Sequence, residues 1–201
     1  MVQDLIPEST DEDDRLILTA AHLLDDVPDG TRILCAPAGP EPSSADGRFC
    51  GTVRRRVPLS HLPSIVVDAA VVKPHPSIAC SSHMDCGAPN GLRDLWVAED
   101  ESEVVAVRKH GAQTGMTSGQ LMPIPADHYM EDVRARYAKG WWAYGSDGAA
   151  FAAKGDSGAI VVDEARRVVG MVVAIDHDGP DAAAFVHGIK QVFAALQIAL
   201  P

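Results

Sequence analysis

At its most informative point the chain reads Gly155-Asp156-Ser157-Gly158-Ala159-Ile160-Val161-Val162. Glycine, aspartate and serine favour a tight turn, and the four apolar residues after Gly158 are typical of a buried strand. A serine on such a turn exposes its Oγ, as a nucleophile must. Glycine adopts backbone conformations closed to other residues, so the N–H groups of Gly155 and Ser157 are candidates to bind a developing oxyanion. The tetrapeptide alone is equally compatible with a turn that has no catalytic role.

Two further residues lie in settings that suit a general base and its orienting acid. His22 directly follows the apolar run Leu16–Ala21, whose small last residues let a loop pack closely behind an imidazole. Asp68 interrupts the otherwise apolar segment 65–72. A buried carboxylate is costly unless hydrogen bonds or a charge satisfy it, and orienting a histidine Nδ1–H is one such arrangement. Singly, His22 also fits an ordinary surface or capping histidine, and Asp68 a turn cap.

The three segments follow one another in the order His22, Asp68, Ser157. In this order and spacing they resemble the trypsin and chymotrypsin family of serine peptidases, in its bacterial form. The order separates that family from the subtilisin and α/β-hydrolase arrangements. The resemblance also includes the segments Val107–Leu121, Val168–Val172 and Phe185–Leu196. It therefore covers nearly the whole chain from about residue 16 to residue 196.

This resemblance implies an all-β fold of two packed six-stranded antiparallel barrels with a C-terminal helix. It divides the chain into a loosely packed or disordered acidic N-terminus at residues 1–14, a first barrel and linker at 15–92, and a second barrel and helix at 93–201. Few residues precede His22. We therefore expect either a first barrel that is incomplete at its N-terminus or a true start of the chain further upstream.

The resemblance also implies an activity. Ser157 would attack a peptide carbonyl and form an acyl-enzyme, with His22 as general base and Asp68 orienting it. No metal or organic cofactor is expected. Two alternatives stay open: a peptidase-like binding or scaffold domain with little or no turnover, and an esterase that uses the same three residues.

The substrate pocket is predicted by position. In the family, the base of the primary pocket lies six residues before the nucleophile, which here is Phe151. An apolar or partly filled pocket follows, with no preference for basic side chains at the cleaved bond. Val173, Ala174 and Ile175 are expected to form the edge that pairs with the substrate backbone.

Histidines and cysteines supply further candidates of lower rank. His177 and His187 could line the pocket and favour acidic side chains, or be ordinary surface and core histidines. Four potential zinc ligands lie within a short segment, although their spacing matches no common zinc pattern: His75, Cys80, His83 and Cys86. We expect no metal site.

Composition excludes several other functions. The 201 residues carry 17 basic and 28 acidic side chains, a net charge of −11, and such a chain repels phosphate backbones. Apolar residues make up 46% of the chain, enough for a sizeable core. No apolar run approaches the roughly 20 residues of a membrane helix. We expect a protein or peptide substrate, no nucleic acid or membrane partner, and a cytoplasmic location with reduced thiols unless a signal peptide lies upstream.

Four local patterns predict individual elements. Ala21–Asp26 suits one helical turn, and Asp127–Tyr137 reads as a short helix or an irregular loop. The apolar segments Ala159–Asp163 and Val168–Ile175 flank a charged turn and predict a hairpin. Apolar residues at helical spacing predict a helix over Ile189–Leu200 that closes the chain.

Overall fold

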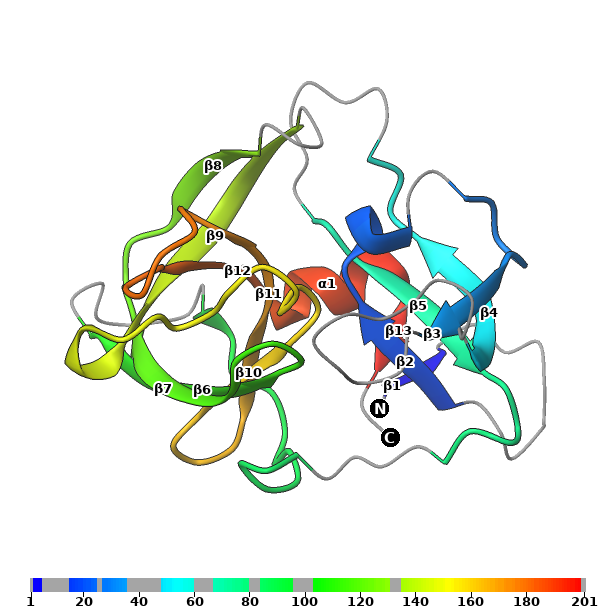
Figure 1. Cartoon of the computed structure of the whole chain (residues 1–201), viewed down its shortest axis with the longest axis horizontal. Coiled ribbons are helices and arrows are strands. Elements are labelled where there is room, and N and C mark those ends of the chain that lie inside the picture. The colour runs from blue at the N-terminus through cyan, green and yellow to red at the C-terminus, as the bar shows by residue number, and fades with distance from the viewer. Residues whose placement is uncertain are drawn as a thin grey trace.

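Two antiparallel sheets make up most of the molecule, with one short α-helix between them (Figure 1). The computed structural model describes residues 2–4, 15–24, 27–35, 48–59, 67–79, 84–95, 103–130 and 135–199. No helix within these ranges has the length and apolar character needed to cross a membrane.

The first sheet has six strands in the order β13-β1-β2-β5-β4-β3. The strands are β1 (Val2–Asp4), β2 (Arg15–Thr19), β3 (Arg32–Cys35), β4 (Arg48–Arg56), β5 (Ala70–Pro74) and β13 (Ile198–Ala199). Within the described ranges no pairing between the outer strands β13 and β3 closes this sheet. The expected six strands are therefore present, arranged as an open sheet.

The second sheet has seven strands in the order β12-β11-β10-β6-β7-β9-β8. The strands are β6 (Val105–Gly111), β7 (Gly115–Leu121), β8 (Ala126–Met130), β9 (Ala135–Gly145), β10 (Ile160–Asp163), β11 (Val168–Ile175) and β12 (Ala184–Gly188). An additional pairing of β12 with β9 closes six of these strands into a barrel, and β8 extends it outside β9. The closed six-stranded antiparallel barrel expected for the C-terminal half is confirmed.

The two ends of the chain meet in the first sheet. Strand β1 pairs with β2 on one side and with β13 on the other, with Gln3 opposite both Arg15 and Ala199. Residues 2–4 of the segment predicted to be disordered or loosely packed thus form a paired strand, and residues 5–14 lie outside the described part of the chain. Because β13 belongs to this sheet, the last strand of the molecule lies with the N-terminal half.

The C-terminal helix is shorter than the periodicity predicts. Helix α1 spans Ile189–Leu196 and ends at Gln197, whose left-handed backbone (φ 52°, ψ 52°) cannot continue a helix. Apolar spacing alone could not reveal this end, because Ile198 is also buried, as part of β13. The helix buries Ile189, Val192, Phe193 and Leu196, which recur at helical spacing on one face.

Three other local predictions can be compared with the structure. The 3-10 turn η1 (Ala21–Leu24) matches the expected helical turn. Strands β10 and β11 form the predicted hairpin, with Ile160 opposite Met171. The prediction for Asp127–Tyr137 is wrong, because its described residues belong to the paired strands β8 and β9. Strand β8 pairs with the neighbouring β9, whereas β9 also pairs with β7 and, farther along the chain, with β12.

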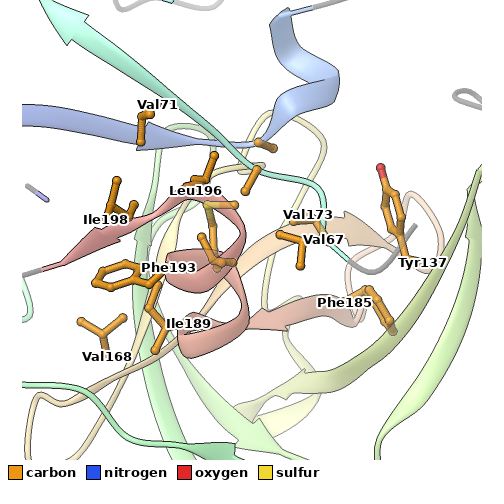
Figure 2. Packing of buried hydrophobic residues seen from close by; sticks show 14 of the residues in the cluster. Val67, Val71, Tyr137, Val168, Val173, Phe185, Ile189, Phe193, Leu196 and Ile198 are labelled. Carbon is orange, nitrogen blue, oxygen red and sulfur yellow. The ribbon is translucent and has the colours of Figure 1, made fainter. Parts of the chain in front are cut away.

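A single hydrophobic cluster joins the two sheets around helix α1. The cluster includes Phe193 and Leu196 of the helix, Val71 of β5 and Val173 of β11, and Figure 2 shows these side chains around the helix. Because the cluster contains residues of both sheets, the loops at their facing ends are held in fixed positions relative to each other. The candidate site lies among these loops.

Candidate active site

His22 and Asp68 come together at the same end of two paired strands. His22 lies in η1 directly after β2, and Asp68 lies just before β5; the two strands pair with Thr19 opposite Ala70. The His22 Nδ1 lies 2.6 Å from Asp68 Oδ2, and the His22 backbone N–H donates to Asp68 Oδ1 at 3.0 Å. Asp68 is fully buried, whereas 12% of the His22 side chain is exposed. The carboxylate therefore fixes both the ring and the backbone of His22.

A third donor reaches the same carboxylate from the other sheet. The Tyr137 hydroxyl, on β9, donates to Asp68 Oδ2 at 2.5 Å. Burial alone would raise the pKa of Asp68, but the hydrogen bonds from His22 and Tyr137 and the attraction of His22 outweigh it, so this pKa lies below its usual value. Sequence reasoning did not find Tyr137, because it placed the residue in a helix or loop.

Ser157 lies on a tight turn at the entrance to β10. The Asp156 N–H donates to the Ala153 carbonyl at 3.0 Å, and Gly155 has φ +105° at the third position of that turn. A positive φ at this position defines a type II turn, which favours glycine. The glycine that the sequence singled out is thus required by the backbone of the turn.

Gly158 brings this turn against the loop that carries His22. It has φ +90°, and its N–H donates to the Val172 carbonyl at 2.8 Å. A Cβ at this position would lie 3.0 Å from Thr19 Oγ1 and 3.4 Å from the backbone N of Ala20. The residue after Ser157 therefore contacts the chain just before His22, although the two belong to different sheets.

Asp156 is anchored beneath the turn. Its carboxylate accepts hydrogen bonds from the N–H and Oγ1 of Thr114 and from the N–H groups of Gln113 and Ala153. Lys109 Nζ lies 3.1 Å from its Oδ2, and both side chains are buried. Burial lowers the pKa of Lys109 despite the opposing effect of Asp156, while the hydrogen bonds overcome burial and lower the pKa of Asp156.

The sequence contains a signal for Lys109, the buried partner of Asp156. Val105, Val107, Lys109 and Gly111 alternate along β6 and all face inward. A lysine on an otherwise buried strand face needs a carboxylate partner.

His22 and Ser157 both line one cavity of about 520 Å³. Ala174 and Ile175 of β11 also line it, as expected, and so does Gly155. His128 and Tyr129, on β8, are lining residues that sequence reasoning missed because it predicted no strand there. The cavity thus opens between the first sheet and the closed barrel.

The side chains of Phe151 and Val173 are fully buried, and neither residue lines the cavity. The pairing of the Val173 backbone with a substrate stays a prediction. Phe151 packs in the interior of the barrel with Val172 and Val186. Ala153, the first residue of the turn before Ser157, lines the cavity.

Several charged and titratable residues also line the cavity. His177 lines the cavity and pairs with Asp176 and Asp181. Lys154 and Asp178 lie at the same cavity. By contrast, His187, the other candidate histidine, does not line the cavity.

His187 lies in the core. It is fully buried and packs edge-on against Tyr137 and Phe185. Burial lowers its pKa to about 4, so the ring is neutral at pH 7. Of its two sequence interpretations, the core histidine agrees with this position.

Cys50 and Cys86 differ in their bonding state. Cys50, on β4, is disulfide-bonded, which corrects the expectation of reduced thiols at this position. Cys86 is a free thiol. Cys80 and His83, two of the four potential zinc ligands, lie outside the described residues, and the described part of the chain contains no metal-ligating cluster.

No family model and no curated protein matches the sequence. Solved structures do match the fold. A glutamic-acid-specific serine protease that uses a histidine triad in substrate binding superposes with a TM-score of 0.61 at 16% identity, over 93% of this chain and 87% of its own. Thermobifida fusca protease A has a TM-score of 0.61 at 16% identity, over 91% of this chain and 82% of its own. Cellulomonas bogoriensis chymotrypsin has a TM-score of 0.58 at 15% identity, over 92% of this chain and 84% of its own.

The chain has the chymotrypsin-like fold. The similarity covers 93% of the chain in the first comparison and 91% in the second. At this level of identity the similarity concerns the fold alone, so the chymotrypsin-like chain is assigned a function from the geometry of its own site.

Proposed function

We propose that this chymotrypsin-like chain is a serine endopeptidase. One observation carries the proposal. The hydrogen-bonded pair of His22 and Asp68 from the first sheet opens onto the same cavity as Ser157 from the closed barrel. A nucleophile, a base and a group that orients the base are the parts that acyl transfer requires.

In the proposed reaction, Ser157 Oγ attacks the carbonyl carbon of the scissile peptide bond while His22 Nε2 takes its proton. The His22 imidazolium then gives this proton to the leaving amine, the C–N bond breaks, and an acyl-enzyme remains on Ser157. In the second step, deacylation, a water molecule activated by His22 releases the acid product. Asp68 holds the Nδ1–H tautomer of His22 and stabilises the imidazolium in both acylation and deacylation.

The N–H groups of Gly155 and Ser157 are proposed to bind the oxyanion. Type I and type II turns differ by a flip of the central peptide, which here joins Lys154 to Gly155. The positive φ of Gly155 supports the form in which its N–H, and not the Lys154 carbonyl, faces the cavity. Donors of this kind typically contribute about a hundredfold or more to the rate.

Substrate is proposed to bind along the free edge of β11. On the side facing β10 this strand is hydrogen-bonded as far as Val172, and on its other side Ala174 and Ile175 pair with β12. The backbone groups of Ala174 and Ile175 that point away from β12 are proposed to pair with an extended peptide. Ala153, a small residue of the turn before Ser157, also lines the cavity. Because the position six residues before Ser157 holds Phe151, an apolar residue buried in the barrel core, and not a carboxylate, we propose no preference for a basic side chain at the cleaved bond.

Covalent labelling with a fluorophosphonate probe tests the proposal directly. The intact chain should take up one probe per molecule, and Ser157→Ala should take up none while remaining folded. His22→Ala should slow labelling by about a thousandfold or more, because the base is lost. If the intact chain is not labelled and cleaves no peptide, the endopeptidase proposal fails and a binding or scaffold role takes its place.

A further inference from the structure

A hydrogen bond between the two halves of the molecule ends on Asp68. Its donor, the Tyr137 hydroxyl, comes from β9 of the closed barrel, whereas Asp68 precedes β5 of the first sheet. The acceptor atom Oδ2 is the same one that lies 2.6 Å from His22 Nδ1. The tyrosine and the histidine therefore share one carboxylate oxygen.

Tyr137 is held in a rigid setting. Its side chain is fully buried, and its ring stacks on Phe185 with 6.3 Å between ring centroids and an angle of 21°. Figure 2 shows this ring beside Phe185 with the hydroxyl pointing away from it. The backbone pairs with His128 of β8. A hydroxyl fixed in this way can hold its acceptor in one orientation at little entropic cost.

We propose that Tyr137 is a positioning residue that holds the Asp68 carboxylate in the rotamer that orients His22. This inference rests on the proposed function. With Oδ1 bound to the His22 backbone and Oδ2 bound to Tyr137, the carboxylate plane cannot rotate away from the imidazole. The same bond ties Asp68 to the barrel that carries Ser157. Tyr137 thus keeps base and nucleophile aligned across the boundary between the sheets.

Three ionisable groups face Asp68 in the described part of the chain: His22, Tyr137 and His187. Burial and the neighbouring Asp68 charge raise the pKa of Tyr137, so its hydroxyl stays protonated and remains a donor wherever the protein is folded. His187 is neutral at pH 7 because its pKa is lowered. Loss of the tyrosine hydroxyl removes one of the bonds that keep the pKa of Asp68 low, so this pKa should rise.

The test compares Tyr137→Phe with Tyr144→Phe. Both variants remove one hydroxyl from β9, but Tyr144 is exposed and serves as the matched control. We expect Tyr137→Phe to lower kcat about tenfold with KM nearly unchanged, and to move the acidic limb of the kcat/KM profile to higher pH. Tyr144→Phe should have the same kcat, the same KM and the same acidic limb as the intact chain. A Tyr137→Phe enzyme with unchanged kcat and an unchanged acidic limb overturns the inference.

A second measurement does not depend on activity. The proton between His22 Nδ1 and Asp68 should give a downfield NMR resonance that shifts in Tyr137→Phe and not in Tyr144→Phe. If the intact chain takes no fluorophosphonate and this shift is still seen, the endopeptidase proposal fails while the positioning role stands. An unmoved resonance removes the positioning role alone.

A milder variant covers the case in which Tyr137→Phe does not fold. Site-specific Tyr137→3-fluorotyrosine keeps the hydroxyl and the ring but makes the phenol a stronger donor. We expect the same resonance to shift in the direction opposite to that of Tyr137→Phe, with an unchanged melting temperature. No shift with this folded variant contradicts the inference.

Discussion

Lys109 illustrates how the environment of one residue sets its role. Its amino group lies in the barrel interior, 3.1 Å from Asp156 Oδ2, and its side chain is fully buried. Removing one partner of a buried ion pair leaves the other charge without compensation, which is more damaging than losing an exposed pair. Because Asp156 immediately precedes Ser157, this pair also supports the shape of the turn.

We predict that Lys109→Met lowers the free energy of unfolding by about 3–5 kcal/mol, as measured by urea denaturation. Lys190→Met is the control, since Lys190 pairs with Asp94 at 3.1 Å while half exposed. Its loss should cost at most about 1 kcal/mol. Equal effects of the two substitutions would show that the buried pair is not important for stability.

At the scale of elements, the site depends on the contact between two loops. The turn after Ala153 brings Gly158 so close to the end of β2 that an added Cβ would lie 3.0 Å from Thr19 Oγ1. His22 follows three residues later in η1. A side chain at position 158 would push the Ser157 turn away from the His22 loop.

We predict that Gly158→Ala costs about 1–2 kcal/mol of stability from its positive φ and slows fluorophosphonate labelling about tenfold or more. Gly148→Ala is the matched control, because Gly148 also has a positive φ (+72°) but nothing within 4 Å of the added Cβ. The control should lose stability to a similar extent and keep its labelling rate. Equal labelling by the two folded variants would contradict the role given to the loop contact.

At the scale of the whole molecule, buried carboxylates link stability to pH. Asp68, at the boundary between the sheets, and Asp156, inside the barrel, both have pKa values below the usual one. A carboxylate with a lowered folded-state pKa contributes stability that is complete above its unfolded-state pKa of about 4. That contribution is lost as the pH falls through the lower, folded-state pKa.

We therefore predict a melting temperature that falls steeply when the pH is lowered from 5 to about 2. Asp68→Asn should show a smaller fall over the same range, because one of the two carboxylates is replaced by a neutral group of the same shape. Differential scanning calorimetry in buffers of constant ionic strength measures both. A melting temperature that is independent of pH below 5 would exclude this coupling.

The amino-acid sequence alone was enough to predict the local features of this protein. The glycines around Ser157, the small residues before His22 and the lone carboxylate in an apolar segment are visible within a few residues of each site. The β10–β11 hairpin and the start of α1 were predicted for the same reason. Such patterns reflect backbone preferences and burial, which depend on near neighbours.

The tertiary structure alone determined which distant residues meet. Tyr137 reaches Asp68, Lys109 reaches Asp156, and Gln3 pairs with Ala199, each across many residues of chain. It also placed Phe151 in the core and not at the cavity wall. These contacts follow from the closing of a barrel and the packing of two sheets on one core, and no periodicity along the chain encodes which residues such packing brings together.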